Sequence, residues 1–432
     1  MASTIAPADE NSPTTSTPQR PPNTKILPYV AKLFQDLKET DANIKISSIS
    51  GFYQEYEQGP DLLIGEDFSD KIRAIVDSIL KKYNDEINAG PDPIGGKYNR
   101  SKLFECLLKE STVKGERIFA FSIFMGIAIP TVFGEDGIRD LGDIVTAVEE
   151  YIRRVGESLE VVWDSLNGLA DSLVMQLIVP VYRTSGTYTP TNTSGFQDGD
   201  GDILPGMTGV EVAKYREFAL SVLARDNYTC TFTGVYDTDA ETGTTSSAYK
   251  VAHIIPWGLG WDFTRYKEAR NRITWNLLDI FDAGDAGRLS DSLAKDLDDI
   301  SNGLTLSREV HRRFEGLQLW LDLRKETDTE YIYTAGGETR GIFGPGVMPH
   351  DRKVTVKKGE GCPDQRLISL HARLSRVALI SGAIHVAREF TGRGATAYLE
   401  HGPDHRSVHP KALELKLLSI NEPEDSNKNS PL

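Results

Sequence analysis

Cysteine is scarce in this chain of 432 residues, which contains only Cys106, Cys230 and Cys362. Three scattered cysteines cannot form the dense disulfide framework of small secreted domains, so we expect a reducing intracellular compartment, cytoplasmic or nuclear. Long apolar runs are also lacking. The longest extends from Ile118 to Ile129 and is followed by Pro130, which is shorter than the roughly 20 residues that a bilayer requires. The sequence therefore predicts no membrane-spanning segment.

Positive charge is in the minority, because 48 Lys and Arg residues face 63 Asp and Glu residues, for a net charge of −15. This balance is not typical of nonspecific DNA-binding proteins, whose affinity comes from neutralised phosphates. The deficit is uneven, since basic residues outnumber acidic ones between Arg340 and Lys416. A basic, helix-like segment also runs from Arg265 to Arg272. It is suited to contact phosphate, although an exposed helix face explains it equally well.

Composition divides the chain into two predicted domains. Residues 1–25 are rich in Pro, Thr and Ser, and residues 420–432 are polar, so both ends are predicted to be disordered tails. Apolar residues at helical spacing predict a helical domain over 26–182, without indicating its role. A linker rich in Thr, Ser and Gly follows at 183–210. The second domain is predicted to occupy residues 211–400.

The helical domain is predicted to contain helices at 26–37, 70–87 and 101–110. A single long helix is predicted over 141–179, where apolar residues recur near heptad spacing. Ordinary core packing accounts for such a stripe, and a surface for a protein partner is the alternative.

In the second domain, the pattern predicts a polar helix at 288–300 and one amphipathic helix at 363–390. Alternating apolar residues predict a strand at 317–323, and residues 331–333 and 353–356 suggest a further hairpin. The amphipathic helix is expected to pack back onto this domain.

Two short motifs carry the functional signal, and the first is Ala-His-Ile-Ile-Pro at residues 252–256. The apolar residues around His253 predict a strand, which Pro256 ends because proline lacks a backbone donor. A histidine on a rigid element suits a general base, since its unperturbed pKa lies near neutrality. A lone histidine in an apolar strand is nevertheless most often a core residue.

The second motif runs from Asn302 to Glu315. Asn302-Gly303 predicts a tight turn, and Ser307 is placed to cap a short helix. On that helix His311 and Glu315 are four residues apart, so their side chains share one face. An imidazole and a carboxylate at this spacing form half of a divalent-metal site, although such a pair alone is usually a solvated face.

Together these motifs resemble the HNH nuclease signature, and the resemblance covers roughly residues 211–325. It implies an α+β protein in which the helical N-terminal domain precedes a ββα-metal nuclease domain with its motif core at 225–323. A long insertion would separate the two motifs, and a C-terminal helix would pack on the domain. The implied activity is metal-dependent hydrolysis of phosphodiester bonds in nucleic acid. We expect the nucleic acid to be DNA, although the sequence does not distinguish DNA from RNA.

The resemblance also implies roles for individual residues. His253 would be the general base, Asn302 would hold the catalytic loop, and His311 with Glu315 would bind a divalent metal ion. Mg²⁺ is the expected cofactor, with Mn²⁺ and Zn²⁺ as alternatives. The expected nucleic-acid contacts are Arg265, Lys267, Arg270, Arg272 and Arg312.

Two departures from the family pattern matter. Cys230 is the remaining ligand of the zinc knuckle that many family members have, so no structural zinc is expected. Much of the family has Asp immediately before the first histidine as a metal ligand, where this chain has Ala252. The remaining ligands would then be the Asn302 carbonyl or an acid such as Asp279 or Asp282. Substituting Asp for Ala252 is expected to strengthen Mg²⁺ binding.

The missing acid and the acidic net charge keep a second hypothesis open. A degraded HNH fold could serve as a scaffold, and the N-terminal helices would then make the protein a binding or regulatory module.

Overall fold

The structure is a computed structural model, and it describes residues 66–89, 98–132, 141–155, 159–186, 209–236, 249–259, 268–283, 287–293, 296–342 and 353–391. Both predicted tails, the predicted helix 26–37 and most of the predicted linker lie outside these ranges. Within them, helices combine with two small antiparallel sheets, which confirms the α+β class.

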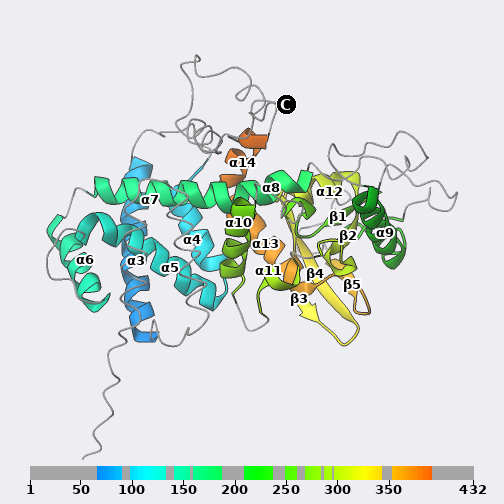
Figure 1. Ribbon diagram of the computed structural model, residues 1–432, viewed down its shortest axis with the longest axis horizontal. Coiled ribbons are helices and arrows are strands. Elements are labelled where there is room, and N and C mark those ends of the chain that lie inside the picture. Colours follow the sequence, from blue (N-terminus) through cyan, green and yellow to red (C-terminus); the bar gives the residue numbers. More distant parts are fainter. Residues whose placement is uncertain are drawn as a thin grey trace, which may run out of the picture.

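The N-terminal helices form the left half of the molecule in Figure 1. They are α3 (Glu66–Ala89), α4 (Arg100–Glu110), α5 (Val113–Val132), α6 (Leu141–Val155) and α7 (Glu160–Leu173). Helix α5 carries the longest apolar run of the chain and packs against α3, α4, α6 and α7. A helix that is apolar around its circumference is stable only when it is surrounded, so α5 forms the centre of this half.

The prediction of one helix over 141–179 is wrong, because α6 ends at Val155 and α7 begins at Glu160. Gly156 lies in the sequence between them, and glycine has a low helix propensity. Helix α7 continues through a π-helical turn, η2 (Val174–Ile178), into α8 (Val179–Gly186), so that the three form one rod in Figure 1. The apolar stripe of α7 is buried against α5 and therefore serves packing within the chain.

The second half contains the two sequence motifs. Its elements are α9 (Gly209–Arg225), β1 (Tyr249–His253), η5 (Trp257–Leu259), α10 (Glu268–Phe281), α11 (Leu289–Ser292), η6 (Ile300–Asn302), β2 (Gly303–Ser307) and α12 (Arg308–Glu315). Strands β1 and β2 pair antiparallel, with Tyr249 opposite Ser307 and His253 opposite Gly303. Helix α12 follows β2 directly, so the pair and the helix form a ββα unit.

A second sheet and two helices complete the chain. They are β3 (Leu319–Glu326), β4 (Glu330–Gly337), β5 (Lys353–Lys357), α13 (Gln365–Ile380) and α14 (Ala383–Thr391). The predicted strand and hairpin form one antiparallel sheet in the order β3-β4-β5.

Two helix predictions in this half are wrong. The polar helix expected over 288–300 is reduced to the single turn α11, because its acids and serines favour turns over helix. The helix expected over 363–390 bends by 88° between α13 and α14. Gly382 has a φ of +77° at the bend, which a residue with a side chain rarely adopts.

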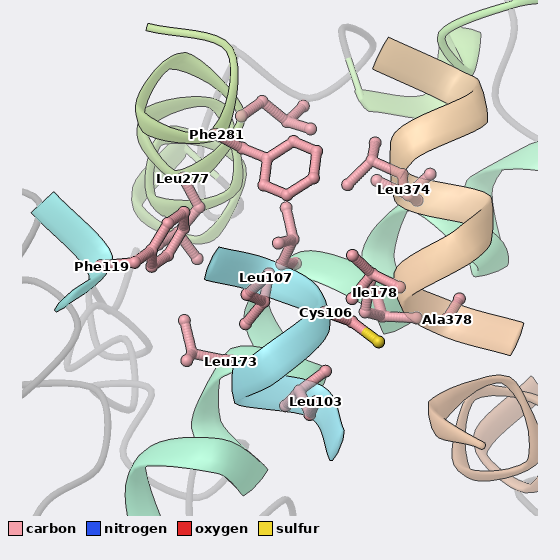
Figure 2. Packing of buried hydrophobic residues seen from close by; sticks show 14 of the residues in the cluster. Leu103, Cys106, Leu107, Phe119, Leu173, Ile178, Leu277, Phe281, Leu374 and Ala378 are labelled. Carbon is pink, nitrogen blue, oxygen red and sulfur yellow. The ribbon is translucent and has the colours of Figure 1, made fainter. Parts of the chain in front are cut away.

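One hydrophobic core connects the two halves. Figure 2 shows Leu103 and Cys106 of α4, Phe119 of α5 and Ile178 of η2 converging with Phe281 of α10. Helix α13 joins them and packs on both α4 and β3. Helix α10, in the insertion between the two motifs, and helix α13 therefore both attach the ββα unit to the N-terminal helices.

No single helix in the described part of the chain is both long and apolar enough to cross a membrane; the bent pair α13 and α14 passes that test by length and composition only.

Candidate active site

Arg225, the last residue of α9, holds the turn that leads into β2. Its guanidinium donates hydrogen bonds to the carbonyl oxygens of Ile300 (2.7 Å) and Gly303 (2.8 Å). It also forms a two-bond ion pair with Asp226, which in turn accepts the backbone N–H of Thr305 (2.9 Å). This ion pair therefore fixes η6 and the start of β2 relative to α9.

Asn302 is fully buried at the end of η6, and both ends of its amide bond the backbone. Its Oδ1 accepts the N–H of Ile255 (2.9 Å), while Nδ2 donates to the carbonyls of Ile255 (3.0 Å) and Leu297 (3.0 Å). The segment that follows His253 is therefore attached to the η6 turn. These hydrogen bonds hold the backbone in position. Both polar atoms of the Asn302 amide are engaged in them, so Asn302 has a structural role here.

His253 ends β1 with a side chain that is only 6% exposed. The ring stacks on Phe218 of α9, with centroids 4.4 Å apart and planes inclined by 14°. Its Nε2 donates a hydrogen bond to Oδ1 of Asp298 at 3.0 Å. Gly303 allows this close approach of α9, since a Cβ there would lie 2.9 Å from the Phe218 ring. The ring is thus fixed in both plane and direction.

His311 is buried on α12 and hydrogen-bonds the backbone of Val251 in β1. Burial lowers the pKa of His311 to about 3, so the ring is neutral at physiological pH. Its Nε2 has no hydrogen-bond partner among the described residues and lies 3.2 Å from Oε1 of Glu315. A neutral imidazole therefore presents its lone pair beside a carboxylate oxygen.

The C-terminal helix holds α12 in place through His371. Its ring stacks on Phe314 with centroids 3.8 Å apart, and its Nε2 donates to the Phe314 carbonyl at 3.0 Å. Burial lowers the pKa of His371 to about 4, so this contact is made by a neutral ring. The position of His311, three residues earlier on α12, depends on this anchor.

Tyr215 of α9 lies where the two motifs meet. Its ring centroid is 5.9 Å from that of His253. Burial raises the pKa of Tyr215, and the carboxylates of Glu315 and Asp298 raise it further. His253 also lowers the pKa of His311. Because these charge effects require proximity, both motifs contribute to one site.

Residues 230–321 match the family model described as HNH endonuclease. The chain carries an HNH endonuclease domain. The match spans β1, the insertion, β2 and α12, whereas α9 and α13 lie outside it. Comparisons with curated proteins and with solved structures give no match.

Position 252 of the HNH domain lies in the core. Ala252 is fully buried in the main core and pairs with Leu304 across the two strands. Neighbouring side chains on a strand point to opposite faces, so Ala252 points away from the face that carries His253. In the described part of the chain, no contact of position 252 with His311 or Glu315 is observed, so the expectation that Ala252→Asp would strengthen Mg²⁺ binding stays a prediction.

The insertion acids proposed as alternative metal ligands are engaged elsewhere. Asp282 forms ion pairs with Arg366 and Arg373 of α13, and these charges join the end of α10 to α13. Asp279 accepts hydrogen bonds from the backbone and hydroxyl of Ser290. Both carboxylates stabilise the fold of the insertion, and the expectation that they complete the metal site is wrong.

The predicted nucleic-acid contacts are only partly described. Arg265 and Lys267 lie outside the described residues, and Arg270 and Arg272 belong to the first turns of α10. Arg312 is exposed on α12 and bonds Glu309 through two nitrogens.

Several contributors to the HNH site lie outside the motifs recognised in the sequence. Asp298, Arg225 and His371 contact the motif residues through tertiary structure. Asp298 stands in a polar, acid-rich stretch, where nothing distinguishes it from its neighbours. Within the described ranges, no group of three or more His, Cys, Asp or Glu side chains is placed to hold a metal ion.

Proposed function

We propose that this protein is a metal-dependent endonuclease that hydrolyses phosphodiester bonds in DNA, with His253 as the general base. The observation that carries the proposal is the pair formed by His311 and Glu315 beside the oriented ring of His253. The buried Nε2 of His311 lacks a hydrogen bond and lies 3.2 Å from a carboxylate oxygen. A buried polar atom of this kind normally has a partner, and a metal ion supplies one.

The spacing of the pair fits a divalent ion. Two ligand atoms that bind Mg²⁺ at adjacent octahedral positions, each about 2.1 Å from the ion, lie about 3.0 Å apart. Tetrahedral ligands of Zn²⁺ lie about 3.4 Å apart. The observed 3.2 Å falls between these values. We favour Mg²⁺ because a site with two protein ligands suits an ion that keeps several waters and binds substrate phosphate.

The metal ion would supply positive charge that stabilises the scissile phosphate. His311 prepares its Nε2 for this role, because the bond to the Val251 backbone directs the ring proton to Nδ1. Its lowered pKa keeps Nε2 unprotonated at neutral pH. Glu315 adds a hard oxygen ligand, the kind that Mg²⁺ prefers.

His253 would take the proton of the attacking water. Since Nε2 donates to Asp298, the lone pair of the neutral ring is on Nδ1. The stack on Phe218 fixes the plane in which that lone pair points. Asn302 holds the backbone that follows His253 and acts as a positioning residue.

The alternative, a degraded HNH scaffold, relied on Ala252 in place of an acid and on the acidic net charge of the chain. Because Ala252 belongs to the core, the loss of an acid there removes nothing from the face that carries His253. The intact geometry of His253, His311 and Glu315 favours the enzyme.

A plasmid-nicking assay tests the proposed function. Purified full-length protein is expected to convert supercoiled plasmid to nicked circles in millimolar Mg²⁺ or Mn²⁺, and EDTA is expected to stop the reaction. Nicking that persists in EDTA would contradict metal dependence. Absence of nicking of DNA with every divalent ion, together with absence of RNA cleavage, would favour the scaffold hypothesis.

Substitution of Asp298 tests the orientation of the base. Asp298→Asn keeps the size of the side chain and replaces the charged acceptor, so the ring of His253 can adopt the wrong tautomer. We expect cleavage to slow by about 10- to 100-fold, as for other carboxylates that orient histidine, with metal affinity unchanged. Restoration of the cleavage rate by Asp298→Glu would support a positioning role, and an unchanged cleavage rate in Asp298→Asn would exclude it.

A further inference from the structure

One face of α12 carries a cation next to the metal-binding pair. Arg308, His311 and Glu315 are spaced by three and four residues, so their side chains follow one line along the helix. Lys250 approaches from β1, where it precedes Val251, the residue whose backbone bonds His311. Helix α12 and strand β1 therefore each contribute one cation near His311 and Glu315.

Electrostatic effects relate Lys250 to the pair and to Arg308. Burial lowers the pKa of Lys250, and the guanidinium of Arg308 lowers it further, while Glu315 opposes this shift. Lys250 in turn helps to lower the pKa of His311. Lys250 thus lies within electrostatic range of Arg308, Glu315 and His311.

These two cations differ from the other arginines around the site. Arg312 and Arg313 are both bound to Glu309, and Arg225 is bound to Asp226. No ion pair of Lys250 or Arg308 occurs in the part of the chain that the structure describes. Placing two like charges together, one of them half-buried, is unfavourable unless an anion joins them.

We propose that Lys250 and Arg308 form a phosphate-binding subsite that holds the backbone of the cleaved strand beside His311 and Glu315. The inference rests on the proposed nuclease function, since it assigns the substrate contacts of that site. A phosphate there would neutralise both cations and lie next to the metal pair. Contacts to phosphate fix the position of a strand without selecting its sequence. The subsite therefore predicts binding that depends on salt and only weakly on sequence.

Binding of a fluorescein-labelled DNA duplex in EDTA, measured by anisotropy at several salt concentrations, tests this subsite without cleavage. Lys250→Gln and Arg308→Gln should each weaken binding and reduce the slope of log K against log salt by about 0.9. Lys102→Gln, which removes the same charge from the surface of α4, is the matched control and should leave the slope unchanged. Lys250→Arg should retain the wild-type slope, and it covers the case in which Lys250→Gln fails to fold.

The outcomes separate this inference from the proposed function. An unchanged slope in both glutamine variants, or an equal loss in Lys102→Gln, would overturn the subsite even if the wild-type protein cleaves DNA. A reduced slope in both variants, together with a wild-type protein that does not cleave, would support the subsite and contradict the nuclease.

Discussion

Replacing His253 with Ala is expected to slow DNA cleavage by about 10²- to 10⁴-fold, the usual contribution of a general base. The affinity for Mn²⁺ should remain nearly unchanged, because the proposed ligands are His311 and Glu315. Replacing either ligand with Ala should instead weaken Mn²⁺ binding. Nicking rates and calorimetric titration of Mn²⁺ on the same preparations measure both effects. An equal loss of Mn²⁺ binding in all three variants would show that His253 is a ligand and that the roles are misassigned.

The fold of the His253 variant requires its own control. The ring stacks on Phe218, so truncation leaves a space beside the Phe218 ring. We expect a loss of stability of about 2 kcal/mol, which a protein of this size can tolerate. Thermal unfolding should therefore show a folded protein at the assay temperature. His253→Gln, which fills more of the space, provides a second variant if His253→Ala is unfolded.

The spacing of the two motifs made part of the site predictable. His311 and Glu315 share a helix, so their proximity depends on local geometry alone, and the structure places their polar atoms 3.2 Å apart. The strand that ends at His253 was likewise predictable from the flanking apolar residues and Pro256. Local patterns of this kind predict side-chain placement when the partner lies within one turn or one strand.

Contacts between distant segments were not predictable. Asp298 reaches His253 from 45 positions away, and His371 reaches Phe314 from 57 positions away. Neither contact has a periodic pattern in the sequence.

The helical boundaries failed for a related reason. Apolar periodicity continues across residues 141–179 and 363–390, but α6 and α7 are separate helices, and the chain bends at Gly382 between α13 and α14. Periodicity reports which residues are buried and does not report the direction of the helix axis.

Ala252→Asp is expected to destabilise the protein strongly. The new carboxylate would lie in the main core, opposite Leu304 on β2. A buried carboxyl must then stay protonated, which at pH 7 costs about 4 kcal/mol for a group with an unperturbed pKa near 3.9. Because the folded-state pKa is raised, the loss should be largest at neutral pH and should diminish as the pH falls towards 4.

Ala224→Asp provides the matched control, since Ala224 is exposed on α9 in the same half of the molecule. There the change should cost less than about 1 kcal/mol, mainly through helix propensity. Urea denaturation at pH 7 and pH 4.5 compares the two variants, and calorimetric titration of Mg²⁺ compares their metal binding. If Ala252→Asp is as stable as Ala224→Asp and binds Mg²⁺ more tightly than the wild-type protein, position 252 reaches the metal site. The proposed two-ligand site would then be incomplete, since a third ligand position would lie on β1.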